Sequence, residues 1–144
     1  MARKYHYSEE VLFLAVSYND RFLTQIPIEV SNLQLLGVTV MFIACKYEEP
    51  RCVSLDVNEC LYLTDNTYTR PQNFEMEIKI LRTLKFDVGN PTTNTFLSIF
   101  SALDKMKSVE IEIAKYITDL VLLELCSSCS PYKLLLLCCG GGAR

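Results

Sequence analysis

Several residue types are scarce in this chain, and each scarcity excludes a class of protein. The 144 residues include no tryptophan, one histidine, five glycines and five prolines. A chain so poor in turn-forming residues is suited to helices. The single histidine, His6, is close to the N-terminus and is interpreted as solvated, and no glycine-rich phosphate loop or Ser/His/Asp set is visible. The sequence therefore predicts a protein that is not an enzyme and that uses no cofactor.

Charge of one sign and long apolar runs are also lacking. The formal net charge is -3 at pH 7, without a long run of either sign. Nucleic-acid binders usually carry a basic patch or stripe, so we expect no nucleic-acid partner. The longest apolar run, Leu134 to Cys139, has about a third of the roughly 20 residues that a membrane helix needs. No apolar signal peptide is visible at the start, and we expect no membrane partner.

Cysteine is the residue type whose abundance suggests a different class, since seven cysteines in a short chain can indicate a secreted disulfide scaffold. Cys45 and Cys60 fall among apolar residues, where a thiol behaves as a small hydrophobe. Cys126-x-x-Cys129 and Cys138-Cys139 suggest a zinc site, but a second Cys-x-x-Cys is missing. We therefore expect incidental thiols, no metal, and a reducing compartment.

Apolar residues recur at helical spacing along most of the chain. The expected helices cover residues 9–23, 30–47, 53–61, 69–85, 92–103 and 108–125. The second is apolar on nearly every side, which predicts a buried helix with Gly37 as a point of close packing. Thr69 and Gln72 have the spacing of a capping box. The Gly89-Asn90-Pro91 break predicts a boundary between two domains, residues 1–89 and 90–144.

The order of the motifs in these helices resembles the cyclin family. Residues 13–23 are similar to the second helix of the cyclin box, and residues 33–49 to its central third helix. Residues 62–69 resemble the segment before the fifth helix, and Met76-Glu77 with residues 84–97 complete the series. The sequence of residues 62–69 and the Gly-Asn-Pro-Thr junction look most like those of A-type mitotic cyclins, particularly those of plants.

The resemblance implies a fold and a function. The fold is all-α: a cyclin-box five-helix fold lacking most of its first helix, plus the start of a second cyclin-like helical unit with an atypical tail. The function is that of a regulatory subunit that binds and activates a cyclin-dependent serine/threonine kinase in cell-cycle control, in the nucleus and/or the cytoplasm. Cyclins press their third and fifth helices onto a mobile helix of the kinase, which favours its active arrangement.

The resemblance also assigns roles to particular residues. The charged pair that bonds to kinase backbone corresponds to Lys46 and Glu77. The apolar kinase-facing positions correspond to Ile43, Tyr47 and Phe86. A remnant of the groove that takes substrates or inhibitors with a short basic-hydrophobic motif corresponds to Leu33, Gln34 and Leu63. On spacing alone, the same charges are interpreted as solvated and the same apolar side chains as core.

Two alternatives to the kinase-activating subunit stay open. The first is a degenerate or truncated remnant without kinase-activating ability, because only the end of the family's first helix corresponds to Arg3 to Ser8. The missing part supplies an arginine that the family pairs with the aspartate matching Asp20, which would then bond to Arg21, another neighbour or water. The second alternative is a cyclin-fold adaptor protein.

Overall fold

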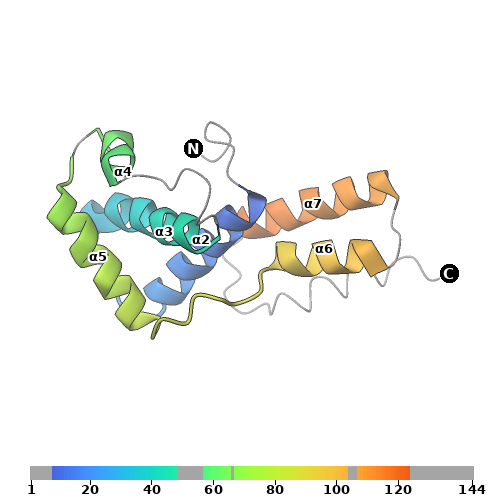
Figure 1. Ribbon diagram of the computed structural model, residues 1–144, viewed down its shortest axis with the longest axis horizontal. Coiled ribbons are helices and arrows are strands. Elements are labelled where there is room, and N and C mark those ends of the chain that lie inside the picture. Colours follow the sequence, from blue (N-terminus) through green and yellow to red (C-terminus); the bar gives the residue numbers. More distant parts are fainter. Residues whose placement is uncertain (1–7, 49–56, 66, 104–106, 124–144) are drawn as a thin grey trace. The chain divides into compact units, whose positions relative to one another are not determined.

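The computed structural model describes residues 8–48, 57–65, 67–103 and 107–123 (Figure 1). Within this part of the chain the secondary structure is helical, which confirms the all-α prediction. The helices are α2 (Glu9–Leu23), the short 3-10 helix η1 (Val30–Asn32), α3 (Leu33–Glu48), α4 (Val57–Leu63), α5 (Arg70–Thr83), α6 (Thr93–Leu103) and α7 (Ser108–Leu123). The expected end of the first helix, from Arg3 onward, lies outside the described residues except for Ser8, the N-cap of α2.

The chain divides into two compact units, residues 1–90 and 91–144. In the first unit α3 is the central helix, and α2, α4 and α5 pack against it (Figure 1). Ten of its sixteen residues are buried, as its apolar sequence predicts. The packing around Gly37 differs from the prediction. A Cβ added there would meet no atom within 4 Å, so the prediction of close packing at this glycine is wrong.

The length and hydropathy of residues Val30–Glu48 would also allow a membrane span. The stretch is not an uninterrupted apolar run, because the polar residues Asn32, Gln34 and Lys46 lie within it. A core helix passes the same test, and half of this stretch is buried inside the protein. Since α2 and α5 cover it, we interpret it as the core helix of the first unit.

Both ends of helix α5 are capped by hydrogen bonds between residues that are close together in the sequence. At its start, the Thr69 N–H donates to Gln72 Oε1 at 2.7 Å, which confirms the predicted helix start. At its end, the N–H groups of Lys85 and Phe86 donate to the carbonyl oxygens of Arg82 at 3.0 Å and Leu81 at 2.8 Å. This pair of bonds is a Schellman motif, in which the residue after the C-cap takes a left-handed conformation.

Tyr18 on α2 is a fully buried tyrosine whose hydroxyl donates to the carbonyl oxygen of Val88 at 2.7 Å. Burial raises the pKa of Tyr18 to about 12, with a smaller raising effect from Tyr47 and an opposing effect from Arg21. The folded state thus favours the protonated phenol. Its contribution to stability is complete below the ordinary pKa of about 10 and is lost as the pH rises towards 12.

We therefore expect Tyr18→Phe to change the alkaline unfolding of the protein. At pH 8 the variant loses about 1 kcal/mol with its hydrogen bond. Between pH 10 and 12 the wild type loses up to about 3 kcal/mol that the variant does not lose, so the two stability curves cross. Urea unfolding across this pH range measures both curves, with Tyr62→Phe as the exposed-tyrosine control. If the stability curves of the wild type and Tyr18→Phe were parallel, this would contradict a raised pKa of the buried Tyr18 hydroxyl.

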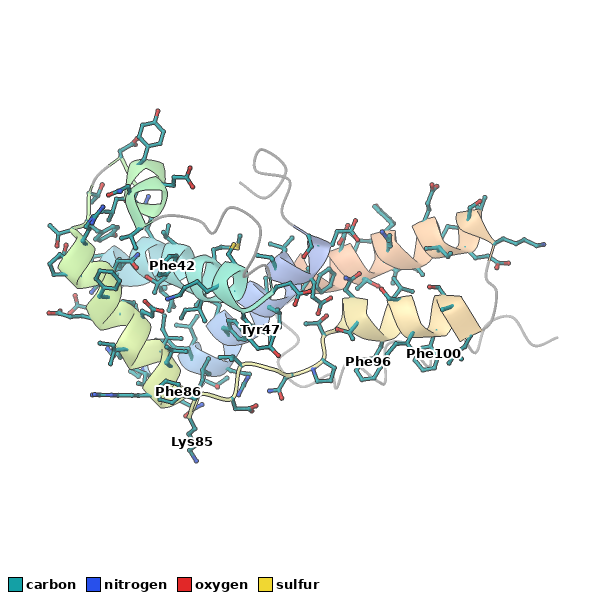
Figure 2. The ribbon with its side chains drawn as sticks, in the orientation of Figure 1. Phe42, Tyr47, Lys85, Phe86, Phe96 and Phe100 are labelled. Carbon is teal, nitrogen blue, oxygen red and sulfur yellow. The ribbon has the colours of Figure 1, made fainter. Side chains whose placement is uncertain are left out.

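In the second unit, α6 and α7 pack on each other around Leu97 and Ala114. Phe96 is partly buried against this pair, while Phe100 is 39% exposed (Figure 2). An apolar stripe on α7 is exposed at helical spacing; it consists of Val109, Ile113, Tyr116 and Leu120. The described part of this unit therefore buries a small core.

Candidate docking site

The end of α3 and the middle of α5 bring two charged side chains together. Lys46, in the last turn of α3, donates to Glu77 Oε1 on α5 and forms an ion pair with it. The Lys46 ammonium also lies 4.2 Å from the centre of the Phe42 ring, a cation–π distance. The Glu77 side chain is 11% exposed and the Lys46 side chain 42%. The pair is thus open to a partner mainly from the Lys46 side.

Two aromatic side chains at the ends of these helices are exposed. Tyr47 follows Lys46 on α3 and is 48% exposed, and Phe86 follows the end of α5 and is 67% exposed. Figure 2 shows these side chains at the ends of their helices. Ile43 is different, since it is 4% exposed and belongs to the core of the first unit. The structure therefore leaves Ile43 little surface for a partner, and we omit it from the proposed contact.

The backbone that carries Phe86 is in an uncommon conformation. Lys85 has a φ of 54° and Phe86 a φ of 59°, both in the left-handed region. Glycine is the usual residue there, because a side chain costs roughly 1–2 kcal/mol in this conformation. Two such residues in succession persist only where the surrounding contacts hold them, and they often lie at functional sites. Here they hold an exposed aromatic ring at the end of α5.

Of the three expected groove residues, the structure describes two side chains. Leu33 and Gln34 are exposed at the start of α3, Leu33 at 41%. Leu63 is the last residue of α4, and its side chain lies outside the described ones. Asp20 is half-buried on α2, and Arg21 does not pair with it, because the Arg21 guanidinium bonds to Asp87.

Sequence reasoning missed three features that surround the site. Arg21 Nη2 donates to Asp87 Oδ2 at 3.0 Å, a pair separated by 66 positions that no local pattern signals. The hydrogen bond from Tyr18 to Val88 is equally distant in sequence. Asn73 on α5 is fully buried, and neither polar atom of its side chain has a hydrogen-bond partner in the described part of the chain. Its helical spacing from Met76 and Ile80, which are buried on the same helix, was the available signal.

No metal-ligating cluster of three or more side chains is present in residues 8–48, 57–65, 67–103 and 107–123. Cys126, Cys129, Cys138 and Cys139 lie outside these ranges. Of the earlier cysteines, Cys45 is 1% exposed within α3, and the side chain of Cys60 is not among the described ones. The Lys46–Glu77 pair and the rings of Tyr47 and Phe86 offer hydrogen-bonding groups and aromatic surface to a partner.

Comparison with known proteins gives one family. The family model for the cyclin N-terminal domain matches residues 1–89. A putative cyclin-A3-1 of Arabidopsis thaliana is 42% identical, over 86% of this chain and 36% of its own length. Cyclin-A1-2 of Arabidopsis thaliana is 46% identical, over 86% and 29%, and G2/mitotic-specific cyclin-B1 of Xenopus laevis is 39% identical, over 84% and 30%. The chain spans about a third of the length of these curated relatives.

Proposed function

The chain belongs to the cyclin family, and on this premise we propose that it is a regulatory subunit that binds and activates a cyclin-dependent serine/threonine kinase. Cyclins are non-catalytic regulatory subunits, so the prediction that the chain is not an enzyme is confirmed. The resemblance to plant A-type cyclins is confirmed as well.

One observation carries the proposal. Lys46 at the end of α3 pairs with Glu77 in the middle of α5. Tyr47, next to Lys46, and Phe86, after the end of α5, expose their rings. Lysine donates to carbonyl oxygens and a carboxylate accepts from N–H groups, so the pair suits the backbone of a docked helix. Aromatic side chains at such a surface are frequent anchors of binding energy. A kinase that is bound more tightly in its active arrangement shifts towards that arrangement.

Further parts of the proposal follow from the family. Residues 90–144 form the start of a second cyclin-like domain after the N-terminal cyclin box of residues 1–89. Leu33, Gln34 and Leu63 contribute to a groove for substrates or inhibitors that carry a short basic-hydrophobic motif. The protein acts in cell-cycle control in the nucleus and/or the cytoplasm, without a nucleic-acid or membrane partner.

A binding experiment with the whole chain tests the proposal. We expect the chain to capture a purified cyclin-dependent kinase and to raise its phosphorylation of histone. We expect Phe86→Ala to weaken kinase affinity at least about tenfold, since anchors at interface centres contribute about 2 kcal/mol or more. Tyr116→Ala on α7 is the matched control, because Tyr116 is 64% exposed against 67% for Phe86. The control is expected to leave affinity within about twofold.

Three other results would change the conclusion. Binding without activation would favour a competitor of longer cyclins. Absence of binding by a cooperatively folded sample would contradict the kinase-binding proposal and favour the adaptor alternative. Absence of a cooperative thermal transition would favour the degenerate remnant.

A further inference from the structure

We propose that Arg21 and Tyr18 on α2 are positioning residues for partner binding: they hold the connector, residues Lys85–Asn90, in the conformation that presents Phe86. The inference rests on the proposed function and extends it to a helix other than the two that carry the docking residues. Neither residue needs to touch the partner. Each acts through the connector.

The contacts place two anchors on one face of α2. Arg21 Nη1 donates to the carbonyl oxygen of Asp87 at 2.8 Å, and Arg21 Nη2 donates to Asp87 Oδ2 at 3.0 Å. One turn earlier on the same helix, the Tyr18 hydroxyl donates to the carbonyl oxygen of Val88 at 2.7 Å. Consecutive backbone carbonyls of the connector are thus fixed by residues three positions apart on α2, which lie on one helix face.

The connector is also fixed from within. Asn90 Nδ2 donates to Asp87 Oδ2 at 3.1 Å, and the Val88 N–H donates to the carbonyl oxygen of Phe86 at 3.1 Å. On the other side of Phe86, the Schellman bonds join Lys85 and Phe86 to α5. Phe86 therefore lies between two sets of anchors, one from α5 and one from α2.

Phe86 does not hold its own conformation by packing. Its side chain is 67% exposed, so little apolar burial offsets the left-handed φ of 59°. A strained backbone of this kind persists only when its surroundings impose it. The α5 bonds hold Lys85 and the N–H of Phe86, and the bonds from α2 to the two residues after Phe86 fix the backbone on its other side. Loss of the Arg21 bonds would release the connector on that side.

The connector also touches the second aromatic residue of the docking site. A Cβ added at Gly89 would lie 2.8 Å from the hydroxyl oxygen of Tyr47, which shows how closely the two residues approach. Asp87 and Arg21 contribute little to overall stability, because their side chains are 59% and 30% exposed and an exposed pair is worth about 1 kcal/mol or less. The conformation that the pair imposes on the connector is therefore more important for binding than its contribution to the free energy of unfolding.

A double-mutant cycle in kinase binding tests the proposal. Arg21→Met keeps the apolar stem and removes the guanidinium. We expect it to weaken kinase affinity about fivefold in the wild-type chain and less than about twofold in the Phe86→Ala background, because the lost contact is then already absent. Arg70→Met is the matched control: Arg70 also bonds within the chain, to Asn58 at 2.9 Å, but at the opposite end of α5. It is expected to weaken affinity equally, and less than twofold, in both backgrounds.

The outcomes separate this inference from the proposed function. A wild-type chain that binds no kinase, or a Phe86→Ala variant with unchanged affinity, would overturn the proposed docking surface and the positioning role with it. If Phe86→Ala weakens binding and Arg21→Met weakens it by the same factor in both backgrounds, Arg21 acts through general stability, and the positioning role alone is overturned. Thermal unfolding of each variant confirms that the compared chains are folded.

Discussion

Replacing Lys46 with methionine is expected to lower the free energy of unfolding by about 3 kcal/mol, because it leaves the Glu77 carboxylate buried without its charged partner. The Glu77 side chain is 11% exposed, so water reaches it poorly. The substitution also removes the cation–π contact between Lys46 and Phe42. Because the Lys46 side chain is 42% exposed, the loss is expected at the lower end of the range for a buried pair.

The double variant Lys46→Met/Glu77→Gln should recover most of this loss. Removing both charges leaves no buried carboxylate, so its stability is expected within about 1 kcal/mol of the wild type. Urea unfolding of the two single variants and the double variant measures the coupling directly. Arg21→Met is the control for an exposed pair, with an expected loss of about 1 kcal/mol or less. An equal loss in Lys46→Met and Arg21→Met would contradict the role of burial.

The double variant also separates folding from docking. A single Lys46 variant is expected to weaken the proposed kinase binding for two reasons, because it destabilises the fold and removes a donor. Lys46→Met/Glu77→Gln restores the fold but lacks both charges. We expect it to bind the kinase at least about tenfold more weakly than the wild type at nearly unchanged stability. Unchanged affinity in this stable variant would show that the pair serves the fold alone.

Replacing Asn73 with leucine is expected to raise the free energy of unfolding by about 2 kcal/mol. Asn73 is 0% exposed, and neither its amide nitrogen nor its amide oxygen has a hydrogen-bond partner among the described residues. Leucine has as many side-chain heavy atoms as asparagine, branches at the same carbon and favours the helix more than asparagine does. The gain therefore comes from removing two buried polar atoms without opening a cavity.

Urea unfolding compares the leucine variant with Asn73→Ala. The alanine variant also removes the amide but leaves a cavity, so its stability is expected within about 1 kcal/mol of the wild type. The leucine variant should then be more stable than both the wild type and the alanine variant. A loss of stability in Asn73→Leu would show that the amide is bonded to a part of the chain outside the described residues.

Much of this fold can be predicted from the sequence, because it depends on interactions between residues a few positions apart. The apolar period of α2 and the Thr69–Gln72 pair at the start of α5 concern residues within a few positions of each other, and both were predicted. The left-handed Lys85 and Phe86 were not, because the sequence signal for that conformation is glycine. The bond from Arg21 to Asp87 joins residues 66 positions apart, and only the packing of the helices brings them together.

The candidate site shows the same division. Spacing alone indicates that Lys46 and Glu77 are two solvated charges. Only the resemblance to cyclins assigns them a shared role in binding a kinase. The structure brings them into contact and buries Glu77. Ile43 lies one turn before Tyr47 on α3, yet one is 4% exposed and the other 48%. An apolar helix of this kind does not indicate by itself which side stays open.

The two left-handed residues at the end of α5 have a consequence for the thermodynamics of association. Lysine and phenylalanine have fewer accessible backbone conformations than glycine would have at positions 85 and 86. A ring held on such a backbone has less conformational entropy to lose when a partner covers it. The same turn therefore lowers the stability of the free chain by the cost of its two left-handed residues, and it would strengthen a complex in which a partner covers the ring.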